Sequence, residues 1–127
     1  MKILVVDDET DVRTLFEQRF RREIRSGALS FSFAYSGEAA LEYLHDHFSE
    51  VVLILSDINM PGMSGLELLQ HITEEHPAPP RPMVMMITAY GDDESRRQAL
   101  ELGASDLLTK PVDFAALKER LLSLNQA

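Results

Sequence analysis

The stretch "VVLILSDINMPGMSG" (residues 51–65) holds the pattern that decides the fold. Residues 51–55 are all apolar, which is typical of a strand buried on both faces of a parallel sheet. Ser56 and Asp57 come next, a Pro-Gly turn follows, and Ser64 with Glu67 forms a capping-box pattern that begins a helix. Strand, turn and helix in this order predict a βα unit. A carboxylate at the end of a buried strand costs free energy unless something uses it.

The same alternation of strand and helix signals runs along the whole chain. The predicted strands are 2–6, 31–35, 51–55, 83–87 and 106–109. The predicted helices run from Val12 to Gly27, from Ala40 to Phe48, from Ser64 through Ile72, from Asp92 or Asp93 to Gly103, and from Asp113 through Leu124. This alternation predicts an α/β fold of the flavodoxin-like type, a doubly wound five-stranded parallel sheet with five helices. The three wholly apolar strands belong in its centre, which favours the strand order 2-1-3-4-5.

Composition narrows the possible functions. The 127 residues, 45% hydrophobic and 26% charged, fit one globular domain over 1–127. A net charge of −9 disfavours direct binding of nucleic acid and is compatible with a hard cation. No apolar run approaches the roughly 20 residues of a membrane span. The chain has no cysteine, which excludes thiol catalysis and zinc-thiolate sites and suits a cytoplasmic location.

Chemically active side chains follow four of the predicted strands. Asp7 and Asp8 come after the first strand, Asp57 after the third, Thr88 after the fourth and Lys110 after the fifth. The carboxyl ends of parallel strands share one edge of the sheet, where ligands of this fold bind near the point at which the strand order reverses. We therefore expect these side chains to form one site.

The grouped side chains have a chemical logic. Clustered carboxylates raise one another's pKa unless a cation neutralises them, and all-oxygen ligands select an ion such as Mg²⁺. Asp8 and Asp57 can be such ligands, and Asp57 can also attack phosphorus to form an aspartyl-phosphate. Lys110 would stabilise the charge of the transferring phosphoryl group, and Thr88 would hydrogen-bond one of its oxygens.

These residues resemble the receiver domain of two-component response regulators. The resemblance is carried by "ILVVDDE" (3–9), "LILSDINMPGMSG" (53–65), "MMITAY" (85–90) and "GASDLLTKP" (103–111). Each segment alone is weak, but together they extend over almost the entire chain. The resemblance implies a signalling domain rather than an enzyme, which accepts a phosphoryl group from a histidine kinase or histidine phosphotransfer protein and assists its own slow dephosphorylation.

The resemblance also implies a role for each site residue. Asp57 would be the phosphoacceptor, with Thr88 and Lys110 contacting the phosphoryl group. Asp8 and Asp57 would bind Mg²⁺ together with the main-chain carbonyl of Asn59, and Asp7 would support the metal site. The bond between Lys110 and Pro111 would be cis. Phosphorylation would change the surface made by the fourth helix, the fifth strand and the fifth helix, and so control an output domain or effector protein.

Several positions depart from the family pattern or tune it. In the family, an aromatic residue on the fifth strand often changes rotamer together with the threonine at the Thr88 position, and this coupled movement acts as a switch. Leu107 occupies the place of that aromatic residue, so the switch is expected to be muted or carried by other residues. Val112 replaces the common phenylalanine after Lys-Pro. In the family that these residues resemble, the positions of Asn59 and Tyr90 tune the lifetime of the phosphate, so the same role is expected here. The sequence leaves open whether the receiver stands alone or belongs to a longer chain.

Two other functions fit the same fold less well. A phosphatase with an aspartyl nucleophile typically needs a general acid two residues after Asp57, but Asn59 cannot supply a proton. A flavin-binding module would need a phosphate-cradling loop after the first strand. That place holds Asp7, Asp8 and Glu9, which repel phosphate in the absence of a metal.

Overall fold

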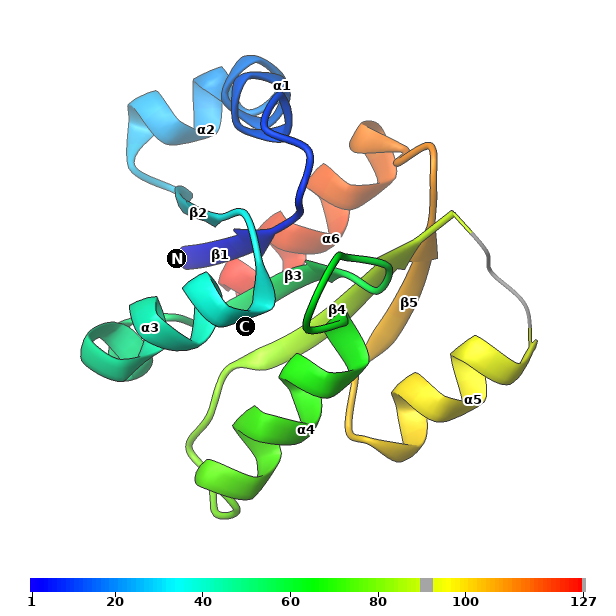
Figure 1. Ribbon diagram of the computed structural model, residues 1–127. Helices are drawn as coiled ribbons and strands as arrows, with labels where there is room; N and C mark the ends of the chain where they lie inside the picture. Colours follow the sequence, from blue (N-terminus) through cyan, green and yellow to red (C-terminus); the bar gives the residue numbers. More distant parts are fainter. Residues whose placement is uncertain (90–92, 127) are drawn as a thin grey trace.

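The computed structural model describes residues 1–89 and 93–126 as a parallel sheet between two layers of helices (Figure 1). The strands are β1 (Lys2–Val6), β2 (Ser30–Ala34), β3 (Leu53–Asp57), β4 (Met83–Thr88) and β5 (Asp106–Thr109). The helices are α1 (Val12–Arg19), α2 (Arg21–Ser26), α3 (Gly37–His47), α4 (Gly65–Glu75), α5 (Asp93–Glu101) and α6 (Phe114–Gln126), with a 3-10 turn, η1 (Phe48–Glu50). The strand order is β2-β1-β3-β4-β5, which confirms the predicted flavodoxin-like arrangement.

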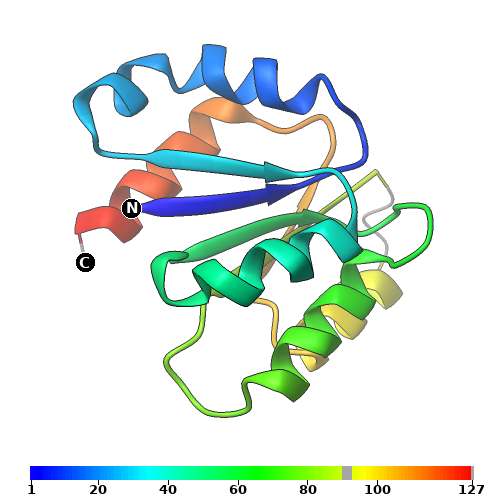
Figure 2. The same ribbon diagram turned by 60° about the vertical axis from the view of Figure 1, so that its left-hand side comes forward.

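Alternate residues of the central strands face two separate hydrophobic clusters. Leu4 and Val6 pack with α3, α4 and α5, whereas Ile3 and Val5 pack with α1 and α6. Figure 2 shows the same layers from the side of β2, which lies at one edge of the sheet. Because side chains alternate along a strand, neighbouring residues of each central strand pack into opposite layers. The sheet is therefore buried on both faces, as the apolar strands predict.

The third strand begins later than predicted. It spans Leu53–Asp57 rather than 51–55, so Asp57 is its last residue instead of following it. Leu53 pairs with Ile3 of β1 and with Met83 of β4, and these two neighbours fix the register. A run that is apolar throughout has no alternation that could reveal its register, since each residue suits either face.

The first predicted helix is two helices, so residues 1–89 and 93–126 form six helices where five were predicted. The chain breaks at Phe20, whose φ of −112° and ψ of 22° are not helical. Phe20 is fully buried and its ring packs against Phe16, Phe31 and Phe114. This aromatic packing holds the break in place, and Gly27 then ends α2 with a left-handed φ of 83° as predicted.

The other helix ends follow local sequence signals. Ser64 accepts a hydrogen bond from Glu67 N–H and the Glu67 carboxylate accepts one from Ser64 N–H, which confirms the capping box. Asp113 accepts a hydrogen bond from the Ala116 N–H and so caps α6. The alternative cap Asp92 lies outside the described residues.

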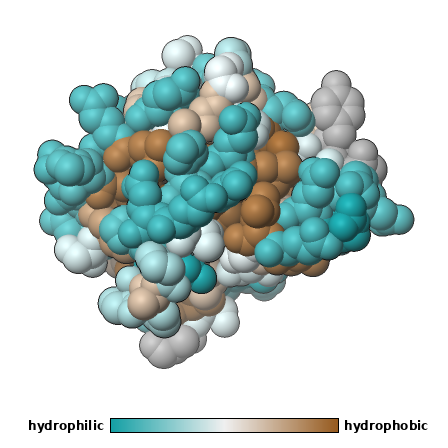
Figure 3. Space-filling model, turned by 60° about the horizontal axis from the view of Figure 1, so that its bottom comes forward, coloured by the Kyte–Doolittle hydropathy of each residue, from teal (hydrophilic) through white to brown (hydrophobic). Residues whose placement is uncertain are grey.

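Figure 3 shows one face on which polar side chains surround smaller hydrophobic areas. The large hydrophobic side chains that remain exposed are Leu15, Ile24, Tyr35, Val52, Met83 and Leu100. In the part of the chain that the structure describes, no helix is both long enough and apolar enough to cross a membrane.

Candidate phosphoacceptor and metal site

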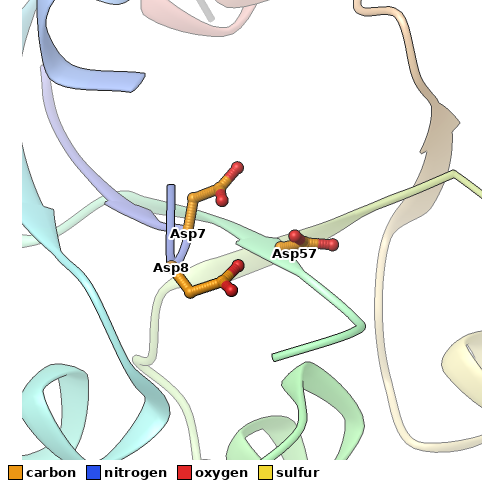
Figure 4. A group of neighbouring side chains, drawn as sticks. All are labelled: Asp7, Asp8 and Asp57. Atoms are coloured by element: carbon orange, nitrogen blue, oxygen red, sulfur yellow. The ribbon is translucent and has the colours of Figure 1, made fainter. Parts of the chain in front are cut away.

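Three carboxylates meet where β1 and β3 end (Figure 4). Asp7 and Asp8 directly follow β1, and Asp57 ends the neighbouring strand β3. One oxygen from each carboxylate lies within 4.8 Å of the others. Asp7 and Asp57 are buried, whereas Asp8 is exposed. The side chains come together because β1 and β3 are parallel neighbours at the point where the strand order reverses.

The backbone after β3 holds Asp57 in place. The Ile58 N–H donates to the Ile87 carbonyl at 2.9 Å, and the Gly65 N–H donates to the Ile58 carbonyl at 2.8 Å. A Cβ on Gly65 would overlap the backbone carbonyl oxygen of Asp57, so only glycine allows α4 to begin this close to the strand. The Asn59 N–H adds a hydrogen bond of 3.3 Å to the Asp57 carboxylate.

Lys110 reaches this carboxylate from the other side of the site. Its Nζ lies 3.1 Å from Oδ2 of Asp57, 3.5 Å from Oδ2 of Asp7 and 3.7 Å from Oε1 of Glu9. The Lys110 N–H donates to the Thr88 carbonyl at 2.8 Å, which ties the end of β5 to β4. The Lys110–Pro111 bond is cis, as the family resemblance implies. The Lys110 ammonium group therefore forms ion pairs with three carboxylates.

Thr88 ends β4 and is 1% exposed. The Asn59 amide donates to the Thr88 hydroxyl at a Nδ2–Oγ1 distance of 3.4 Å. The side chain of Asn59 thus bridges the loop after β3 to the end of β4. Sequence reasoning placed Thr88 at the site but did not foresee this contact, because it depends on the conformation of the loop.

Burial and charge act against each other at Asp57. Burial raises the pKa of its carboxyl group, the hydrogen bond and charge of Lys110 lower it, and the net shift is upward. At Lys110, burial lowers the pKa of the ammonium group, while its hydrogen bond to Asp57 and the charges of Asp7, Asp57 and Glu9 raise it. The net shift at Lys110 is also upward, so its ammonium group stays charged. The carboxylates outnumber this cation, which leaves a local excess of negative charge.

The donor set fits a hard divalent cation. Asp7, Asp8 and Asp57 offer only oxygen atoms, and Mg²⁺ prefers oxygen ligands while needing only one or two carboxylates. A cation beside them would offset the repulsion that Lys110 leaves uncompensated. Exposed Asp8 leaves the group open to solvent, which suits an ion that keeps several water ligands.

The structure brings together the predicted side chains of Asp7, Asp8, Asp57, Thr88 and Lys110. Asp7, Asp8, Asp57 and Lys110 surround one point, and Thr88 lies beside Asn59 at the end of β4. Glu9 was missed as a member, although it directly follows the two aspartates in the sequence. Tyr90, expected to tune the phosphate lifetime, lies outside the described residues.

Comparison with known proteins identifies the family. The sequence model described as "Response regulator receiver domain" matches residues 3–122. The chain belongs to the response regulator receiver family. Receiver domains of two-component systems are signalling domains that accept phosphoryl groups, so the residues that meet at the ends of β1 and β3 belong to a fold with that general function.

Curated relatives are longer response regulators. Response regulator protein PilR of Pseudomonas aeruginosa is 43% identical over 122 residues, which are 93% of this chain and 24% of PilR. Response regulator RppA of Synechocystis is 36% identical over 126 residues, which are 99% of this chain and 51% of RppA. The receiver chain thus spans between about a quarter and a half of the length of these relatives.

Solved receiver structures share the fold. The CheX–CheY–BeF₃–Mg²⁺ complex of Borrelia burgdorferi matches with a TM-score of 0.80 and 28% identity, covering 98% of this chain and 88% of the other. A response regulator receiver protein of Pseudomonas putida matches with a TM-score of 0.81 and 28% identity, covering 97% of this chain and 95% of the other. The receiver fold therefore extends over nearly all of the chain.

Proposed function

We propose that Asp57 is the phosphoacceptor of a single receiver domain over 1–127, and that a histidine kinase or histidine phosphotransfer protein is the donor. The observation that carries this proposal is the 3.1 Å contact between Lys110 Nζ and a buried carboxylate oxygen of Asp57. A cytoplasmic location, expected from the lack of cysteine, is part of the proposal.

In the proposed reaction, a carboxylate oxygen of Asp57 attacks the phosphorus of a phosphohistidine. The new O–P bond forms as the P–N bond breaks, and the electron pair of that bond stays on the histidine nitrogen. The Lys110 ammonium is close enough to Asp57 to stabilise the negative charge on the phosphoryl oxygens. Thr88, whose hydroxyl oxygen accepts a hydrogen bond from the Asn59 amide, would donate its hydroxyl hydrogen to one of these oxygens.

The proposed metal ligands are Asp8, Asp57 and the main-chain carbonyl of Asn59, with Asp7 in support. When bound, Mg²⁺ supplies positive charge beside the transferring phosphoryl group. The aspartates themselves orient the site, because Asp7 and Asp57 share Lys110 and so fix its ammonium between them.

A groove beside the site supports a protein as the donor. It has a volume of about 570 Å³ and extends from Asp7 and Lys110 along α1 to the start of α6. Leu15, Phe16 and Phe114 give it an apolar lining. We propose that the donor protein covers this groove, because an apolar surface next to a reactive carboxylate suits a protein–protein contact.

The proposed output is a change in the surface made by α5, β5 and α6, which starts at the Thr88 and Lys110 ends of β4 and β5. This surface would control an output domain or effector protein. Direct nucleic acid binding by the receiver itself stays disfavoured by the net charge of −9. The relative NtrC of Escherichia coli is described as a DNA-binding transcriptional regulator, but this chain matches only 24% of it.

A phosphatase with Asp57 as nucleophile is the alternative. It is disfavoured because Asn59 holds the position of the general acid and has no acidic proton. Its amide instead donates to Thr88.

The deciding experiment treats the protein with acetyl phosphate or beryllofluoride, with and without Mg²⁺, and detects the adduct by intact mass or ¹⁹F NMR. We expect a metal-dependent adduct that Asp57→Asn abolishes and that the exposed control Glu74→Gln retains. An adduct on another residue, or none in the wild type, contradicts the proposal. For the metal, Asp8→Asn should weaken Mg²⁺ binding strongly in a titration, and unchanged affinity contradicts the assigned ligand.

A further inference from the structure

The edge of the molecule at β2 carries two strips of opposite charge. Figures 1 and 2 both show β2 as the outer strand, with α2 on one side of it and α3 on the other. We call the surface made by α2, β2 and α3 the β2 edge. The last residue of β2 adjoins the phosphoacceptor site, because the Asp7 N–H donates to the Ala34 carbonyl at 3.1 Å. The charged strips themselves lie on the helices α2 and α3.

The strip on α2 is basic. Arg21, Arg22 and Arg25 are exposed, on the side of the helix opposite buried Phe20 and half-buried Glu23. Within the described residues none of these three arginines has an ion pair, whereas Glu23, the one acid of α2, pairs with Lys118 of α6 at 3.5 Å. Arginines three and four positions apart on one helix repel each other. The chain therefore keeps three clustered positive charges that nothing in the described structure neutralises.

The strip on α3 is acidic. Glu38, Glu42 and Asp46 are exposed and follow one another at every fourth position of the helix. The Glu38 carboxylate lies beside Gly62 in the loop after β3, so Glu42 and Asp46 form the part of the row that is available at the β2 edge. In the described part of the chain no basic group forms an ion pair with any of them. The row is opposite to the buried residues Ala40 and Leu44, which pack against the sheet.

The strand between the strips is itself partly apolar and has a free edge. β2 pairs with β1 on one side only, because it is the first strand in the sheet order. Exposed Ile24 of α2 and Tyr35 after β2 add apolar surface beside it. The β2 edge thus has a basic strip, an apolar middle and an acidic strip in this order.

The β2 edge of one copy can pair with the β2 edge of a second copy, because the basic strip of each can face the acidic strip of the other. A two-fold axis parallel to β2 would turn one copy over, so that α2 of each copy faces α3 of the other. An axis perpendicular to the sheet would instead place α2 against α2, and arginine would face arginine. The spacing also fits, because residues 21 and 25 and residues 42 and 46 are each about 6 Å apart along their helices.

We propose that the β2 edge is the contact of a symmetric homodimer, with the arginines of α2 paired to the acids of α3 in the partner copy. The two contacts are equivalent, as a two-fold interface requires. The occupant is a second copy of this chain. The net charge of −9 on each copy opposes association, so the dimer should be weak and should weaken further as salt screens the paired strips.

The test measures mass by sedimentation velocity over a wide range of protein concentration, at low and at high salt. The wild type should form dimers at low salt and lose them at high salt. Arg21→Glu with Arg25→Glu, and separately Glu42→Lys with Asp46→Lys, should each abolish the dimer. The four substitutions combined keep the net charge of −9 and reverse the charge at the four paired positions. Opposite charges then face each other again, so the combined variant should restore the dimer.

A matched control separates this contact from general repulsion. Glu42→Lys with Asp46→Lys changes the net charge from −9 to −5, and so does Glu74→Lys with Glu75→Lys on the exposed end of α4. The α4 variant should dimerise at least as well as the wild type, whereas the α3 variant should not. Circular dichroism confirms that each variant is folded. A monomeric wild type, a dimeric α3 variant or a failed charge exchange overturns the proposal.

Discussion

The Lys110 ammonium lies 3.1 Å from the Asp57 carboxylate, although the two residues are 53 positions apart in the sequence. Lys110 follows β5 and Asp57 ends β3, with β4 between the two strands. The pair therefore spans the width of two strand spacings. It places a cation at the one carboxylate that the proposed function makes reactive.

Replacing Lys110 should slow phosphorylation more than it disturbs the fold. In Lys110→Ala the developing charge on the phosphoryl group loses a positioned cation, so we expect a rate loss of about 10²-fold or more with acetyl phosphate. Stopped-flow measurement of adduct formation tests this. Lys118→Ala, which removes the partner of Glu23 instead, is the control and should keep the wild-type rate. Equal rates for Lys110→Ala and the wild type would remove Lys110 from the mechanism.

The raised pKa of Asp57 makes the stability of the metal-free protein depend on pH. The folded chain holds the proton of this carboxyl group at a higher pH than the unfolded chain does, because burial raises its pKa more than Lys110 lowers it. Stability should therefore fall as the pH rises through the window between the unfolded and folded pKa values.

Asp57→Asn removes the free-energy cost of burying an ionised carboxylate. We expect the variant to unfold at higher denaturant concentration than the wild type at neutral pH, with the difference disappearing below the ordinary pKa of an aspartic acid. Urea unfolding at several pH values, in the presence of a chelator, measures the effect. A variant that is less stable than the wild type at neutral pH would show that the contact with Lys110 outweighs burial.

Gly65 should tolerate no side chain. A Cβ there would overlap the Asp57 carbonyl oxygen, which is backbone and cannot rotate away. Gly65→Ala should therefore displace the end of β3 and lower both stability and the phosphorylation rate. The neighbouring Ser64→Ala is the matched control. It loses the cap at a cost of about 1 kcal/mol in the free energy of unfolding, but leaves the carbonyl in place and should keep the rate. Similar rates in both variants would contradict the close-approach argument.

Leu107 should act as a core residue in this receiver. It is 3% exposed and belongs to the hydrophobic cluster under α3, α4 and α5. Leu107→Ala should lower the free energy of unfolding by about 2–5 kcal/mol through the cavity it leaves, while the acetyl phosphate rate stays near wild type. Leu108→Ala, at a half-buried position on the other face of the sheet, should cost less. A large rate loss without loss of stability would assign Leu107 to the switch instead.

The sequence could predict which residues gather at the site, for a simple physical reason. Parallel strands place their carboxyl ends at one edge, so the residues after four apolar runs had to lie near each other once the strand order was known. The contacts within the site were harder to predict. The bridge from Asn59 to Thr88 and the reach of Lys110 to Glu9 depend on loop paths and rotamers, which leave no periodic signal.

The sequence by itself determined the strand order, the two-sided core and the capping box. These features depend on apolar patterns and hydrogen bonds among residues that are close together in the sequence. Tertiary structure alone decided the register of β3 and the break at Phe20. An all-apolar run has no preferred face until its neighbours pair with it. The spacing of Phe16, Phe20 and Ile24 suits one continuous helix, whereas in the structure the chain breaks at Phe20, where its ring packs among three other aromatic rings.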